Sequence, residues 1–145
     1  MSEPRCEIPQ HNPGSEAIAT LLRQARRIAV VGHSDDPSRD SYRVANYLRK
    51  HGYEVFAVNP LARSGAGITF YPDLASVPKP VDIVDIFRRP EFLGAVVDEA
   101  IREGAKAVWM QEGLVDNAAA ARAQRAGLAV VMGRCILKEH ARLIG

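Results

Sequence analysis

Short, continuous apolar runs recur along this chain of 145 residues, and each run is followed by a polar loop and then by a segment with helical spacing. Runs of this kind are typical of strands that are buried on both faces of a parallel sheet. The pattern predicts strands over residues 28–31, 54–58, 81–87, 107–110 and 128–132. The glycine-rich stretch 63–70 predicts a flexible turn with a short edge strand.

Apolar side chains recur at helical spacing between these runs, which predicts helices over residues 15–26, 42–51, 91–102 and 117–126. In the second of them Val44, Ala45 and Leu48 fall on one face, and Gly52 stands where the residue after a helix C-cap belongs. Ser15 is a candidate N-cap for the first. The regular alternation of strand and helix is the feature that most restricts the fold.

Repeated strand–helix units with short connections require parallel strands and right-handed crossovers. The expected fold is therefore α/β: a three-layer, doubly wound, Rossmann-like fold with a mainly parallel sheet. A mass of 15.8 kDa suits a single domain. We assign it to residues 14–145, with residues 1–13, which contain three prolines, as an N-terminal arm. In such sheets the ligand crevice lies beyond the carboxyl ends of the strands.

Composition narrows the range of partners. The net charge of +2 is too small to indicate a nucleic-acid surface, and no apolar run is long enough to cross a bilayer or serve as a signal peptide. We expect a cytoplasmic protein that binds a small molecule, neither nucleic acid nor membrane. Cys6 and Cys135 lack the spacing of a zinc site, which favours two reduced thiols over a disulfide or a metal centre.

The loop after the first strand, GHSDDPSRDSY, ends at a helix N-terminus, where free N–H groups favour an anion. Ser34, Ser38 and Ser41 add hydroxyl donors, and Arg39 adds a guanidinium that suits phosphate. A plainer interpretation has Asp40 or Ser41 capping the helix and Arg39 in solvent. The glycine fingerprints of dinucleotide and P-loop sites are missing, which disfavours NAD bound in the usual way and the hydrolysis of ATP or GTP.

Two further strand ends carry candidate ligand contacts. Phe87-Arg88-Arg89-Pro90 combines an aromatic face, suited to stacking on a base, with two cations suited to phosphate. The alternative is a core phenylalanine beside solvated arginines. Gln111-Glu112-Gly113 offers an amide and a glycine, and as an ordinary turn it would need no ligand.

Four stretches together, VVGHSDDPSRDSYRVANYLRKHGYEVFAVNP, PVDIVDIFRRPE, AVWMQEGL and MGRCILKEHARL, resemble the stand-alone coenzyme A-binding proteins. That family is similar to the coenzyme A-binding half of the succinyl-CoA synthetase α subunit. The resemblance runs from about residue 28 to residue 143 and departs at Gly133, where the family usually has an acidic residue, so roles in the last loop do not carry over.

The resemblance implies non-catalytic binding of coenzyme A (CoA) or an acyl-CoA at the carboxyl edge of the sheet. The residues expected to face the phosphates are Gly32, Ser34, Arg39, Ser41 and Tyr42, with His33 and Pro37 in the same loop. Asn59 and Pro60 would lie on the adenosine side, Phe87, Arg88 and Pro90 would continue the crevice, and Gln111 would close it. For His33, a solvated loop histidine is the favoured interpretation and a ligand contact the alternative.

No catalytic constellation is evident, because the four histidines form no metal-binding or nucleophile-activating pattern. The synthetase reaction needs a phosphorylatable histidine in a further domain and a second subunit, and neither is expected here. Two alternatives stay open: a regulator responsive to NAD or another nucleotide, and a thiol-disulfide or CoA-dependent enzyme that uses Cys135, with Arg134 favouring its thiolate. The acyl group, a homodimer and an unidentified protein partner also stay open.

Overall fold

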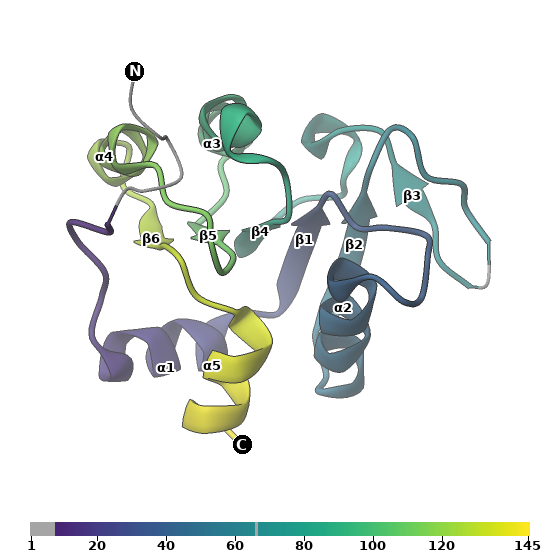
Figure 1. Ribbon diagram of the computed structural model, residues 1–145, viewed down its shortest axis with the longest axis horizontal. Helices are drawn as coiled ribbons and strands as arrows, with labels where there is room; N and C mark the ends of the chain where they lie inside the picture. Colours follow the sequence, from purple (N-terminus) through teal and green to yellow (C-terminus); the bar gives the residue numbers. More distant parts are fainter. Residues whose placement is uncertain (1–7, 66) are drawn as a thin grey trace.

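The computed structural model describes residues 8–65 and 67–145, and these form a six-stranded sheet in which every strand pair is parallel (Figure 1). The strands lie in the order β3-β2-β1-β4-β5-β6. Their bounds are β1 Arg27–Val31, β2 Glu54–Val58, β3 Phe70–Tyr71, β4 Ile83–Ile86, β5 Ala107–Met110 and β6 Ala129–Val131. The expected doubly wound α/β fold is confirmed, with a sheet that is wholly parallel.

Helices cover both faces of the sheet (Figure 1). One face carries α1 (Ser15–Gln24), α2 (Asp40–Lys50) and α5 (Ile136–Leu143). The other carries α3 (Leu93–Arg102) and α4 (Asn117–Arg125), with short 3-10 turns at Leu74–Ser76 and Pro90–Phe92. Alternate residues of each strand face the two helical layers, so Ile28 and Val30 pack in one core and Ala29 and Val31 in the other. Burial on both faces explains why the strands read as continuous apolar runs.

Several predicted element boundaries differ from the structure, including the end of α1 and the start of α2, which each differ by two residues. β4 is shorter than the predicted strand over 81–87, the helix predicted from residue 91 begins with a 3-10 turn, and Gly14, not Ser15, is the N-cap of α1. The sequence interpretation also missed α5. The helical spacing was present in the sequence, because Ile136 and His140 stand four residues apart. The structure buries both residues.

The described part of the N-terminal arm lies against the edge strand. The side chain of Asn12 accepts a hydrogen bond from the backbone N–H of Met132 (2.8 Å) and donates one to its carbonyl (2.9 Å), as a neighbouring strand would. The backbone N–H of Gln10 donates to Asn117 (2.9 Å). Residues 1–7, which include Cys6, lie outside the described residues. Within the described part of the chain, no helix is long and apolar enough to span a membrane.

Candidate functional site

The chain changes direction between β1 and β4, the two central strands. β1 leads into α2 on one face of the sheet and β4 leads into α3 on the other, so the connections diverge beyond the strand ends (Figure 1). Gly32 makes this close pairing of strand ends feasible. Its φ is +90°, and a Cβ there would lie 2.5 Å from the carbonyl oxygen of Phe87.

The loop from Gly32 to Arg39 is held by its own hydroxyl groups. The backbone N–H of Ser34 donates to Oγ of Ser41 (2.9 Å), and the N–H of Asp36 donates to Oγ of Ser34 (3.0 Å). Ser41, which the resemblance placed among the phosphate contacts, is only 6% exposed. Arg39 is exposed and occupies the N-cap position of α2 without a side-chain cap bond.

His33 is completely buried, so the favoured prediction of a solvated loop histidine is wrong. Its Nδ1 lies 2.7 Å from the Ser34 carbonyl and its Nε2 lies 3.2 Å from a guanidinium nitrogen of Arg49. The arrangement fits a neutral ring that donates from Nδ1 and accepts at Nε2. Burial, the largest cause, lowers the pKa of His33 below its usual value. The rings of Tyr42 and Phe70 meet it edge-on.

Asn59 joins the end of β2 to the same loop. Its amide nitrogen donates to the His33 carbonyl (3.1 Å), and its side-chain oxygen accepts from the N–H of Leu61 (2.9 Å). Asn59 therefore fixes the loop, while the neighbouring Pro60 is exposed. The position of a residue directly after a strand predicts that the residue lies near the crevice. It does not tell whether the residue supports the loop or faces a ligand.

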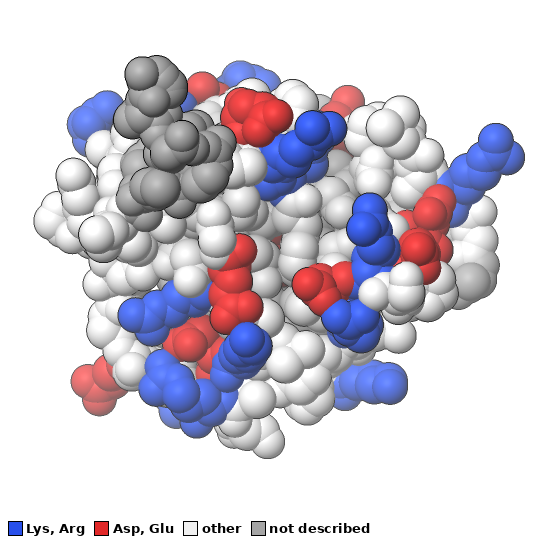
Figure 2. Space-filling view, viewed as in Figure 1, with Lys and Arg blue, Asp and Glu red and all other residues white. Residues whose placement is uncertain are grey.

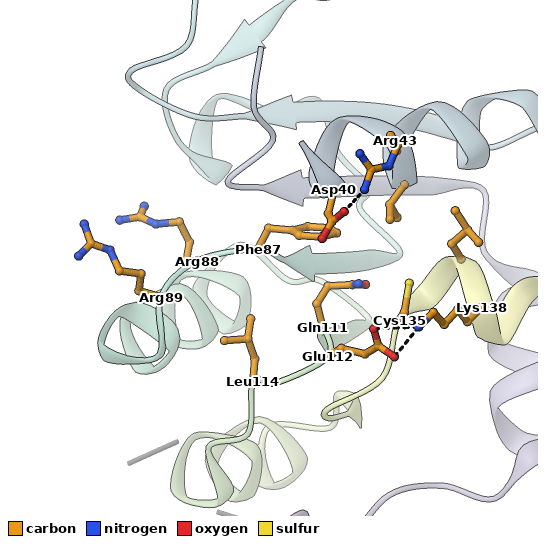
Figure 3. A pocket seen from close by; sticks show the side chains of 12 residues that line it. Asp40, Arg43, Phe87, Arg88, Arg89, Gln111, Glu112, Leu114, Cys135 and Lys138 are labelled. Atoms are coloured by element: carbon orange, nitrogen blue, oxygen red, sulfur yellow. Dashed lines mark hydrogen bonds and ion pairs between the residues drawn. The ribbon is translucent and has the colours of Figure 1, made fainter. Parts of the chain in front are cut away.

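A cleft of about 520 Å³ opens beyond β1, β4, β5 and β6, within the range usual for small-molecule sites. Figure 2 shows it as a hollow with acidic and basic side chains around its rim, and Figure 3 shows the side chains from close by. Its walls come from α2, the loops after β4 and β5, and the start of α5. The lining residues are Asp40, Arg43, Val44, Phe87, Arg88, Arg89, Gln111, Glu112, Leu114, Cys135, Leu137 and Lys138.

The charged residues of the cleft are partly paired. Arg43 bonds to Asp40, and Lys138 bonds to Glu112 at 3.0 Å, on opposite walls (Figure 3). The hydrogen bond that Lys138 donates to Glu112 is the main cause that raises the pKa of Lys138. Arg88 stacks its guanidinium over the ring of Phe92, with 4.3 Å from Cζ to the ring centroid. These ion pairs are exposed, so they are weak and an anionic ligand could displace the acidic partners.

A second hollow of about 320 Å³ lies on the other side of the first loop. It is lined by Asp35, Pro37, Tyr42, Arg63, Gly65, Ile68 and Phe70. Arg63 is a cation that the sequence analysis missed. Arg63 stands four residues after Asn59, in the loop that follows β2. Its place in a loop that follows a strand is the sequence signal that could have identified it.

The predicted site residues thus fall into three groups. Phe87, Arg88 and Gln111 line the main cleft, and Pro37 and Tyr42 line the second hollow. The others line neither hollow: Gly32, His33, Ser34, Ser41 and Asn59 shape the first loop, Arg39 and Pro60 are exposed on loops, and Pro90 begins a 3-10 turn. The cations Arg43 and Lys138 were missed because both lie inside helices. The described residues contain no cluster suited to a metal ion.

Comparison with known proteins gives a consistent result. Residues 26–141 match the CoA binding domain family. The uncharacterized protein YneT of Bacillus subtilis is 38% identical over 130 residues, which are 90% of this chain and 96% of that protein. A hypothetical protein from Pyrococcus horikoshii has a solved structure with a TM-score of 0.89 and 37% identity over the full length of both chains.

A larger protein contains a similar unit. The dinucleotide-forming acetyl-coenzyme A synthetase 1 of Ca. Korarchaeum cryptofilum, solved in its apo form, is 30% identical with a TM-score of 0.65. The match covers 76% of this chain and 27% of that one. The stretch that matches the CoA binding domain family contains every residue that lines the two hollows.

Proposed function

The chain belongs to the CoA-binding domain family, and from this premise we propose that it binds coenzyme A or an acyl-CoA, without turnover, at the carboxyl edge of its sheet. The observation that carries the proposal is the mixed character of the main cleft. Apolar walls from Val44, Phe87 and Leu114 stand beside the cations of Arg43 and Arg88. Such a surface suits a ligand that joins phosphate groups to a long, weakly polar arm.

The two hollows suggest how the ligand lies. The second hollow offers the rings of Tyr42 and Phe70 together with Arg63, a combination that suits adenosine and the phosphate on its ribose. The pyrophosphate would cross the first loop near the N-terminus of α2, where the helix dipole and Arg39 favour negative charge. The pantetheine arm would then follow the main cleft toward α5.

A ligand panel tests the proposal directly. A ligand at 100 times its dissociation constant raises the free energy of unfolding by about 2.7 kcal/mol, which a thermal-shift measurement detects easily. We expect CoA to raise the melting temperature and NAD and ATP to leave it near that of the free protein. A ranking that placed NAD or ATP above CoA would overturn the proposal and favour a nucleotide-responsive regulator.

Arg63→Ala separates the ribose phosphate from the rest of the ligand. A charge-assisted hydrogen bond is worth about 1.5–3 kcal/mol, so this variant should bind CoA at least about tenfold more weakly. Dephospho-CoA, which lacks the ribose phosphate, should bind the variant and the wild type equally. Isothermal titration with both ligands measures the difference.

Arg39→Ala is the matched comparison, because Arg39 is also an exposed loop arginine but lines neither hollow. If Arg39 faces the pyrophosphate, removing its side chain should weaken the binding of CoA and of dephospho-CoA by the same factor. Equal losses for the two ligands in Arg63→Ala would contradict the placement of adenosine in the second hollow.

A further inference from the structure

Cys135 occupies a specific place in the main cleft. It is the N-cap residue of α5, its side chain is partly exposed, and it forms no disulfide. The preceding loop is held in position, because the indole Nε1 of the fully buried Trp109 donates to the Arg134 carbonyl (2.8 Å). The thiol is therefore fixed at the α5 end of the cleft, across from the first loop.

Gln111 provides an independent sign that this end of the cleft receives a ligand. The residue is only 6% exposed, and its Oε1 accepts a hydrogen bond from the N–H of Ile136 (3.1 Å), the first residue of α5. That bond fixes the orientation of the amide, because only the oxygen can accept. The NH₂ end forms no hydrogen bond with another described residue, and the Gln111 side chain extends toward the α5 side of the cleft, where Cys135 lies (Figure 3). The amide nitrogen lines the cleft, where a bound molecule can accept a hydrogen bond from it.

Charged side chains lie near the thiol. Lys138 lies one helical turn into α5, and Cys135 and Asp40 lie close enough to contribute to the raised pKa of its ammonium group. The thiolate form of a cysteine is the nucleophile in disulfide exchange.

We propose that Cys135 forms a reversible mixed disulfide with CoA held in the cleft, the oxidant being the disulfide of CoA itself. The Cys135 thiolate attacks one sulfur of CoA disulfide, a new sulfur–sulfur bond forms to that CoA, and the original sulfur–sulfur bond breaks. The second CoA leaves as a thiolate and takes a proton from water. The Gln111 NH₂ group donates a hydrogen bond to the carbonyl of the pantetheine arm near the sulfur. This inference rests on the proposed function, since it requires that the cleft binds CoA.

The experiment uses the full chain in which Cys6→Ser leaves Cys135 as the one thiol. After incubation with CoA disulfide, intact mass should show the addition of one CoA less two hydrogens, and the adduct should disappear with dithiothreitol. The Cys135→Ser chain, which keeps Cys6, should stay unmodified under the same conditions. Because the cleft holds the reagent, we expect the Cys6→Ser chain to react at least about tenfold faster with CoA disulfide than with glutathione disulfide.

Each other outcome has a definite meaning when reduced CoA is also titrated into the Cys6→Ser chain. Binding of reduced CoA without adduct formation overturns the disulfide and leaves the proposed function standing. Equal rates with the two disulfides, or an equally fast adduct on Cys135→Ser, show unselective thiol chemistry and also overturn the disulfide. No binding of reduced CoA refutes the proposed function, and the disulfide with it.

Discussion

Gly32→Ala is expected to destabilise the fold by roughly 3 kcal/mol or more and to weaken CoA binding at the same time. Two costs combine at this position. A side chain is strained at a φ of +90°, which costs about 1–2 kcal/mol, and the new Cβ would lie 2.5 Å from the Phe87 carbonyl oxygen, which is backbone and cannot rotate away. The end of β4 must move, and Phe87 is part of the cleft wall.

Gly52→Ala is the matched control for this prediction. Gly52 follows the C-terminus of α2 with a φ of +94°, but no atom lies within 4 Å of the Cβ that alanine would add. The loss of stability in Gly52→Ala should equal the conformational cost alone, about 1–2 kcal/mol, and the affinity for CoA should be unchanged. Urea denaturation of the two variants gives the difference. Equal losses would show that the contact between the ends of β1 and β4 is unimportant for stability.

Asp85→Asn is expected to stabilise the protein at pH 8. Asp85 is fully buried in the middle of β4, with Val30 and Trp109 beside it on the neighbouring strands, and neither carboxylate oxygen has a hydrogen-bond partner among the described residues. Burial raises the pKa of this carboxyl well above its usual value. A buried polar group without a partner costs at least about 1–3 kcal/mol, more when charged, and asparagine is never ionised.

The difference in unfolding free energy between Asp85→Asn and the wild type should grow as pH rises. Because the folded-state pKa of Asp85 is raised, the folded protein binds more protons than the unfolded chain above about pH 4, so this residue lowers stability as pH rises. The unfolding free energies of the wild type and Asp85→Asn should therefore be closest near pH 4 and diverge toward pH 8. A wild type more stable than Asp85→Asn at pH 8 would show that the ionised carboxylate is stabilised, contrary to its observed surroundings.

The local pattern of apolar residues predicted most of the architecture. Continuous apolar runs predicted β1, β2, β5 and β6 to within a residue or two, because strands buried on both faces must be apolar throughout. The same reasoning located the crevice beyond the strand ends, since parallel strands place their carboxyl ends at one edge. α5 was missed, although Ile136 and His140, the two buried residues of this helix, stand four positions apart.

The division between ligand-facing and supporting residues could not be obtained in this way. His33 and Ser41 read as exposed polar groups in a phosphate loop, but the structure buries both, against Arg49 from α2 and the backbone of Ser34. Arg43 and Lys138 read as ordinary helix-surface cations and yet line the cleft. In each case the neighbour that decides the role comes from a segment distant in sequence or from the face that a helix turns toward the sheet.

The sequence by itself determined the fold, the family resemblance and the edge of the sheet where a ligand would bind, because periodicity and strand order are properties of local segments. Only the tertiary structure decided which side chains face that edge. The Gln111 amide beside Cys135, the Phe87 carbonyl against Gly32 and the unpartnered carboxylate of Asp85 all result from packing between distant segments, and such packing is fixed only when the whole sheet has formed.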